Sequence, residues 1–254
     1  MAVPRAAAPP VVPAELIIVA DPSEPDHGGS FIEAAAVGVL GGLVAGAVGA
    51  PIGLAVPFIA VGAANGVITG WRRVYDWGCA NGVIAFTLDS TWAIPMTAAG
   101  LASQVLGMVR GEPGYDASMS RRSNRQVFRR GFVPRRGFAI TVGHVISGAG
   151  DTSNPRRQRL VADHEDVHVW QARWFGPLYP LLYGGWMLVG GAAGMFVWAI
   201  THRSQSFTKV VESCAYYLNP FEWWAYSRDD HWPPSGKVLG LGWRNPIVRP
   251  RRHV

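Results

Sequence analysis

The architecture of this chain follows from one stretch of sequence, FIEAAAVGVLGGLVAGAVGAPIGLAVPFIAVGAANGVITG, at residues 31–70. Glu33 is its only charged residue. One membrane-spanning helix needs about 20 apolar residues, so this length suits two. Gly49, Ala50 and Pro51 stand near the middle and favour a turn there. The stretch therefore predicts an N-terminal transmembrane helical hairpin.

Glycines recur at every fourth position in both arms of the predicted hairpin: Gly38, Gly42 and Gly46, then Gly62, Gly66 and Gly70. This spacing places each set on one helix face, and a face of small residues lets two helix backbones approach closely in lipid. We expect a glycine zipper between the arms. The alternative is a low-complexity apolar stretch that simply spans. The same faces can also pair between two chains, which makes a homo-oligomer a candidate assembly.

The overall composition also indicates a membrane protein. Charged residues make up 16% of the chain, against about a quarter in a typical soluble domain. The net charge of +6 comes almost entirely from arginine, and many arginines gather in residues 110–159. Arg72 and Arg73 follow the hairpin, and the positive-inside rule puts this side in the cytoplasm. The lipid bilayer is the expected partner, and no nucleic-acid-binding motif accompanies the arginines.

The two ends of the chain carry little information about the fold. Residues 1–30 predict a disordered tail that lacks the form of a signal peptide, and residues 231–254 predict a basic, irregular tail. Cys79 and Cys214 form no C-x-x-C pair, so no disulfide framework or cysteine zinc site is indicated, although a single bridge between them is possible.

Between these ends, residues 79–230 predict a small metal-binding domain. We expect strands at 82–89 and 137–146, a helix at 96–109, a polar arginine-rich loop at 111–135, a helix at 159–175 and a helix-rich part at 205–228. A third span within 79–109 would bury Asp89 in lipid at a high cost. Tryptophans and tyrosines crowd the second half of the domain, as they do at a membrane interface or in a small core.

The motif that carries chemistry is Asp163-His164-Glu165-Asp166-Val167-His168, within the predicted 159–175 helix. His164 and His168 are one turn apart, so both imidazoles can reach one Zn²⁺. Glu165 stands next to the first ligand and can take a proton from a metal-bound water. This is the H-E-x-x-H pattern of zinc metallopeptidases. The alternative is two surface histidines on a polar helix face.

A catalytic zinc site needs a third protein ligand, and Glu222 is the first candidate. Glu222 stands three residues after Asn219, a helix-capping residue, so it can instead complete a capping box with Asn219. The other candidates are Glu212, Asp229 and His231. His144 is expected to be structural, although it could approach the site. His27, His202 and His253 look incidental.

Three motifs together resemble a known family: His164-Glu165-x-x-His168-x-x-Gln171, then Phe175-Gly-Pro-Leu-Tyr, then Asn219-Pro-Phe-Glu222-x-x-Ala225. The chain is similar over about residues 82–230 to small bacterial zincin-like metallopeptidase domains of the gluzincin type. The resemblance implies His164, His168 and Glu222 as metal ligands and Glu165 as the catalytic base. Asp166 departs from the apolar or small residue that is usual there. The expected fold is an α-rich, membrane-associated α+β protein, in which a transmembrane hairpin precedes a zincin-like domain with a short β element.

The apolar segment 178–200 constrains the topology. Its length as a helix is about 34 Å, so a single crossing would put His168 and Glu222 on opposite sides of the membrane. We expect this segment to be a re-entrant or membrane-apposed core element, with bends at its Gly-Gly pairs at 184–185 and 190–191. A crossing with the metal inside the bilayer is the other possibility.

The sequence thus predicts a zinc-dependent hydrolase, a metallopeptidase by motif, in the bacterial inner membrane with its metal domain on the cytoplasmic side. A peptide or protein would be its substrate. The alternative is a non-catalytic glycine-zipper membrane protein with a structural or vestigial metal site. The third hypothesis, an arginine-rich protein that binds nucleic acid, has the least support from the sequence.

Overall fold

The fold is described from a computed structural model that covers residues 29–111, 113–133, 137–201, 205–229, 232, 234 and 241–251. The predicted disordered tail, apart from residues 29 and 30, lies outside the described residues, as do His27, His202 and His253 and much of the predicted tail 231–254.

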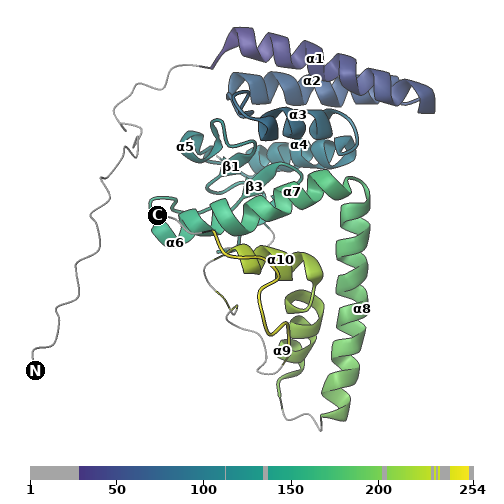
Figure 1. The fold of residues 1–254 in the computed structure, drawn as a ribbon, viewed down its shortest axis with the longest axis vertical. Helices are drawn as coiled ribbons and strands as arrows, with labels where there is room; N and C mark the ends of the chain where they lie inside the picture. The colour runs from purple at the N-terminus through teal and green to yellow at the C-terminus, as the bar shows by residue number, and fades with distance from the viewer. Residues whose placement is uncertain are drawn as a thin grey trace, which may run out of the picture.

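The first two long helices form an antiparallel hairpin, drawn at the top of Figure 1. Helix α1 covers Phe31–Gly49, a short turn η1 covers Ala50–Ile52, and α2 covers Ala55–Trp71. Glycines line the contact between α1 and α2: a Cβ atom placed on Gly41 would lie 2.6 Å from the carbonyl oxygen of Gly62. Only glycine allows two backbones to approach this closely.

Polar contacts fix the base of this hairpin to the rest of the protein. Ser30 caps α1 by accepting a hydrogen bond from the backbone N–H of Glu33. The Glu33 carboxylate binds the Arg122 guanidinium through two contacts of 2.6 and 2.8 Å, and it also accepts a hydrogen bond from Trp77. The single charge of the apolar stretch is therefore compensated at the end of the hairpin.

The predicted strand at 82–89 is wrong, because α3 covers Ala80–Ser90. The buried positions of α3 are Gly82, Ala85, Phe86, Asp89 and Ser90, which follow the helical spacing of three and four residues. The β-branched residues Val83, Ile84 and Thr87 suggested a strand, but they lie on the exposed face. Helix α4, at Ile94–Val109, confirms the prediction for 96–109.

One three-stranded sheet lies in the described part of the chain, with the order β1-β3-β2. Strands β1 (Gln126–Phe128) and β3 (Val145–Ser147) are parallel, and β2 (Ile140–Val142) pairs antiparallel with β3. The predicted strand 137–146 is therefore split into β2 and β3 by a turn. Gly143 lies in that turn with φ = 58°, where other residues are strained. The arginine-rich loop also contains a short helix α5, Ala117–Ser120.

The predicted helix 159–175 is present in three continuous segments, which Figure 1 shows below the sheet. They are α6 (Pro155–Arg159), the π-helical η2 (Leu160–Glu165) and α7 (Asp166–Phe175). Gly176 ends the helix with φ = 51°.

Residues 178–200 form one uninterrupted helix, α8 (Leu178–Ile200), so the predicted bends at the glycine pairs are wrong. Among the described residues, no atom lies within 4 Å of a Cβ atom placed on Gly184, Gly185 or Gly191. The chain returns along α8 instead, through α9 (Phe207–Glu212) and the π-helical η3 (Ser213–Tyr217), to α10 (Pro220–Arg228). Gly190 and Gly194 pack against this return segment, and α10 thereby lies near the start of α8.

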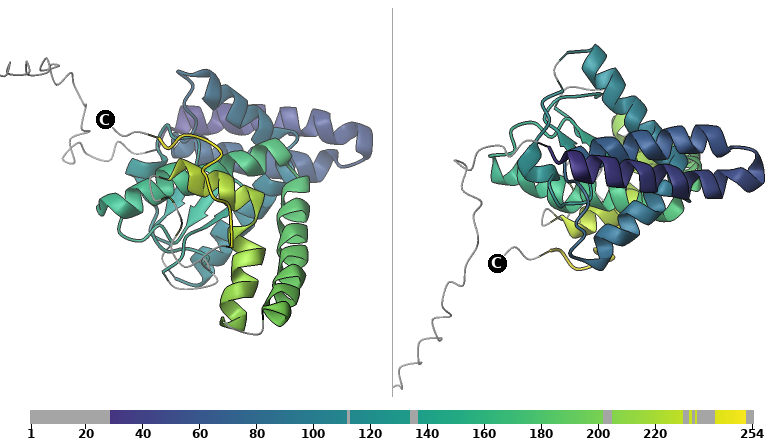
Figure 2. Two further views of the ribbon diagram at one scale, coloured as in Figure 1. Left: turned by 60° about the horizontal axis from the view of Figure 1, so that its bottom comes forward. Right: turned by 90° about the horizontal axis from the view of Figure 1, so that it is seen from above.

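In the part of the chain that the structure describes, two helical segments are long and apolar enough to cross a membrane: Phe31–Ile52, which joins α1 and η1, and Leu178–Ile200. Helices α3 and α4 would form a third span only as a pair, and they are bent by 88° at their junction. The α1–α2 hairpin runs crosswise to α8 (Figures 1 and 2). The observed architecture is thus an α-rich α+β fold with membrane-type helices pointing in two directions.

Candidate metal centre

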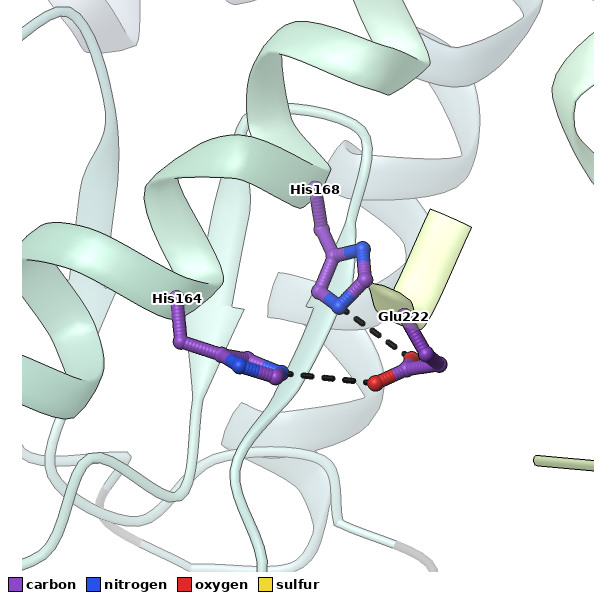
Figure 3. Close-up of side chains that lie close together, drawn as sticks. All are labelled: His164, His168 and Glu222. Atoms are coloured by element: carbon purple, nitrogen blue, oxygen red, sulfur yellow. Dashed lines mark ion pairs between the residues drawn. The ribbon is translucent and has the colours of Figure 1, made fainter. Parts of the chain in front are cut away.

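The structure brings together the three side chains that the sequence predicted as metal ligands. His164 Nε2 lies 3.5 Å from Glu222 Oε2, and His168 Nε2 lies 3.2 Å from Glu222 Oε1 (Figure 3). The ligand atoms of all three residues lie within 4.8 Å of one another, and all three side chains are buried. They form a group that can hold a metal ion.

The donor set is one that holds Zn²⁺ in proteins. Each histidine Nε2 lies 3.2 or 3.5 Å from a different oxygen of the Glu222 carboxylate, so the carboxylate faces both imidazoles. Glu222 Oε2 is buried and has no hydrogen-bond partner among the described residues. A carboxylate oxygen in that position costs free energy unless a cation or a proton compensates it. The donor set, together with a buried carboxylate oxygen that accepts no hydrogen bond, therefore fits a bound cation.

The local helix geometry places the two histidines. His164 and Glu165 lie in the π-helical turn η2, while His168 lies one turn later in α7. The rings of His164 and His168 are 5.0 Å apart between centroids, so both project toward Glu222. π-helical turns occur often at functional sites, because they shift side chains out of the regular helix register.

His168 is oriented through its second ring nitrogen. Its Nδ1 lies 2.8 Å from Gln171 Oε1, and the Gln171 amide donates to the carbonyl oxygen of Phe221, next to Glu222. The Tyr179 hydroxyl lies 3.1 Å from the same Nδ1. A partner on the other nitrogen is the usual means of fixing the tautomer of a ligating histidine. Nε2 of His168 is thereby left to face Glu222.

Glu222 is held by a tyrosine and does not form a capping box. Asn219 caps α10, because its side chain accepts a hydrogen bond from the Phe221 N–H. The backbone N–H of Asn219, which a capping box would direct to Glu222, instead donates to Tyr216. The Tyr183 hydroxyl donates to Glu222 Oε1 at 2.7 Å.

Glu165 and Asp166, two of the three acidic residues of the motif, have different surroundings. Glu165 is buried and accepts a hydrogen bond of 2.7 Å from the Thr141 hydroxyl of β2. Asp166, the residue that departs from the family pattern, binds Arg125 at 2.6 Å and Arg251 at 3.2 Å. Its charge is therefore compensated by arginines rather than by the candidate metal.

The alternative ligands do not join this group in the described part of the chain. Glu212 is exposed on α9, and Asp229 binds Arg156 at 2.8 Å. His231 lies outside the described residues. His144 is buried 3.0 Å from the Gln126 amide, and burial lowers its pKa to about 4, so it is a neutral core residue.

No protein-family model, curated protein or solved structure matches this chain.

Sequence reasoning missed the residues that support the ligands. Tyr179 and Tyr183 are four residues apart on α8 and face one another at 5.8 Å between ring centroids. Their spacing was a usable signal, since residues four apart share one helix face. Thr141 carried no comparable signal, because its contact with Glu165 depends on the strand register.

The metal-free centre is a charged pair. Burial alone would lower the pKa of His168, but the nearby Glu222 carboxylate outweighs burial and raises this pKa to about 9. Burial alone would raise the pKa of Glu222, but His168 and His164 hold it well below its usual range. The stabilisation from protonated His168 is fully present below pH 6.5, its ordinary pKa, and is lost as the pH rises through about 9.

Metal binding should therefore release a proton from His168. A ligating imidazole must be neutral, so protons compete with the metal below pH 9. We expect the apparent affinity for a divalent metal to rise by up to about tenfold per pH unit between pH 7 and 9, and to level off above. Competition titration against a chelating dye between pH 7 and 9 measures this apparent affinity. An affinity that does not change with pH would contradict the protonated pair.

Proposed function

We propose that this chain is a membrane-bound, zinc-dependent hydrolase that cleaves peptide bonds. The observation that carries the proposal is the buried convergence of His164, His168 and Glu222, with Glu165 adjacent to the first ligand. Two histidines and a glutamate are a common ligand set of catalytic zinc. The test measures metal content and peptide hydrolysis in the same detergent-purified preparation. Hydrolysis without bound zinc would contradict the proposed zinc-dependent mechanism.

Each residue has a defined part in this proposal. His164, His168 and Glu222 would hold the ion, which supplies an activated water and polarises the scissile carbonyl. Glu165 would take the proton of that water and pass it to the leaving amine. Thr141 would keep the Glu165 carboxylate oriented through its hydrogen bond. Gln171 and Tyr183 would hold the ligands His168 and Glu222 in place.

Tyr183→Phe is expected to weaken metal binding about tenfold, since loss of a partner that orients a ligand costs about 10–100-fold in affinity. The substitution removes only the hydroxyl that donates to Glu222. Competition titration of zinc against a chelator measures the effect. Tyr217→Phe is the matched control, because no hydrogen bond joins the Tyr217 hydroxyl to a ligand in the described residues. Equal affinities in the two variants would remove Tyr183 from the site.

A structural metal site in a non-catalytic membrane protein is the second candidate. Burial of all three ligands and of Glu165 favours it, because structural sites are closed whereas catalytic sites keep a position open to substrate. The Glu165→Gln variant distinguishes the two candidate functions. If the metal is structural, this variant keeps the stability and function of the wild type, whereas removal of the metal by a chelator destabilises the fold.

We further propose that the α1–α2 hairpin anchors the chain in the bacterial inner membrane as a glycine zipper. The basic residues Arg72 and Arg73 follow α2 directly, on the side where the Glu33–Arg122 ion pair also lies. By the positive-inside rule, this side and the metal domain are cytoplasmic.

A further inference from the structure

The two sides of α8 have different surroundings. One side bears Tyr179, Tyr183, Gly190 and Gly194, which contact the metal ligands or the return segment α9–η3. At 100° per residue, the opposite side bears Leu181, Leu188, Ala192 and Ala199. All four of these residues are exposed, and Leu188 exposes 78% of its surface.

This outer side of α8 is apolar along the whole helix. Residues 178–200 contain no charged side chain, and the exposed set includes Leu181, Leu182, Leu188, Val189, Met195 and Phe196. A continuous exposed patch of this size marks a contact with a membrane or another protein. Something must therefore cover the outer side of α8.

The tip of the α1–α2 hairpin points to the same side of the molecule as α8, on the right in Figures 1 and 2. Leu43, Ile52 and Val56 are exposed at or near this tip. Because the hairpin runs crosswise to α8, the two cannot both cross one flat bilayer along their lengths. Both contact lipid in one orientation: the tip enters the bilayer, and α8 lies along its surface.

Two further observations favour this orientation. Trp92 and Trp174 are exposed beside the start of α8 and are joined by a hydrogen bond from the Trp92 indole to the Trp174 carbonyl oxygen. Exposed tryptophans are typical of the membrane–water interface. The exposed charges Lys209 and Glu212 lie on α9, which packs along the second half of α8. A crossing of α8 would carry these charges into hydrocarbon at a high cost.

We propose that α8 is a membrane-docking helix. Its outer side lies in the surface of the lipid bilayer that receives the hairpin tip, and its inner side positions His168 and Glu222 through Tyr179 and Tyr183. The metal centre then lies at the membrane surface, within reach of polypeptide segments that run along it. The part that concerns the metal rests on the proposed function, whereas the docking of α8 does not.

The depth of α8 in the bilayer tests the docking. Single cysteines replace Leu181, Leu188 and Ala199 in a Cys79→Ser, Cys214→Ala background of the full chain, and each carries a nitroxide label. In phosphatidylcholine vesicles, collisions with oxygen and with a water-soluble nickel complex report the depth of each label. We expect similar, shallow depths at all three positions. A label at Ile52 should lie deeper, and one at Thr208, exposed on α9, should reach water.

The other outcomes each overturn the docking. A label at position 188 much deeper than those at 181 and 199 would show that α8 spans the bilayer. Labels shielded from both reagents would show that a protein, such as a second copy of this chain, covers α8. Labels in contact with water at all three positions would show that α8 does not meet lipid.

The link to the metal has its own measurement. Leu181→Glu combined with Leu188→Glu should displace α8 from the bilayer and lower the zinc affinity in vesicles about tenfold, as loss of partners that orient the ligands does. Thr208→Glu is the control and should bind zinc like the wild type. Unchanged affinity in the double variant would overturn the positioning by α8 but leave the docking and the metal centre intact. Absence of zinc in the wild type would overturn the proposed function, while the depth pattern would still stand.

Discussion

Replacing Arg173 with alanine is expected to lower the free energy of unfolding by about 3–5 kcal/mol, the usual cost of breaking a buried ion pair. Arg173 lies on α7, five residues after His168, and is almost fully buried. Its guanidinium binds both carboxylate oxygens of Asp89 at 2.9 and 2.8 Å. Without Arg173, the buried Asp89 carboxylate loses its countercharge and keeps, among the described residues, the hydrogen bond from the Tyr75 hydroxyl.

Thermal unfolding of the detergent-purified protein measures this effect. Arg129→Ala is the control, and a smaller loss is expected. The Arg129 side chain is 57% exposed, and the buried Asp116 carboxylate keeps its hydrogen bonds from Ser118, Met119 and Thr152 when Arg129 is removed. Changing Asp89 to asparagine and Arg173 to methionine together should cost less than Arg173→Ala alone, since neither partner then keeps a buried charge. An Arg173→Ala protein as stable as the wild type would show that this pair does not hold α7 in place.

Glu165→Gln is expected to lower peptide hydrolysis about 10²–10⁴-fold while the metal content stays unchanged. Glutamine keeps the size of the side chain and can still accept the hydrogen bond from Thr141, but it cannot take a proton. Initial rates on quenched fluorogenic peptides, with metal analysis of the same samples, measure both quantities.

Asp166→Asn provides the matched control for Glu165→Gln. Asp166 is the neighbouring carboxylate, but its contacts are Arg125 and Arg251. We expect Asp166→Asn to keep hydrolysis within about tenfold of the wild type, because it removes charge from a structural pair rather than from the base. Full activity in Glu165→Gln would contradict the peptidase mechanism and favour the structural metal site.

Local sequence patterns predicted the helical hairpin and the grouping of His164 with His168, because both depend on short, regular spacings. The four-residue glycine repeat places small residues between α1 and α2, and the His164–His168 spacing places two imidazoles on one side of a helix. The role of Glu222 was left open by the sequence, because the same residues can form a capping box or supply a metal ligand. The choice between them depends on Tyr183 and the two histidines, which lie far away in the sequence.

Sequence patterns that occur in both strands and helices did not predict the secondary structure correctly. The stretch 82–89 is rich in β-branched residues, yet the packing of Ala85, Phe86 and Asp89 makes it helical. The predicted bends in residues 178–200 were wrong for a different reason. Glycine pairs permit a bend but do not cause one. Helix α8 is uninterrupted, and Gly190 and Gly194 are packing sites for the return segment instead.

Metal content tests the central claim most directly. Elemental analysis of detergent-purified wild type, beside His164→Ala and Glu222→Ala, should find about one zinc ion per wild-type chain and little in either variant. Zinc lost in His164→Ala but kept in Glu222→Ala would contradict the three-ligand centre. No metal in the wild type, even after zinc is supplied, would contradict both the metal centre and the hydrolase.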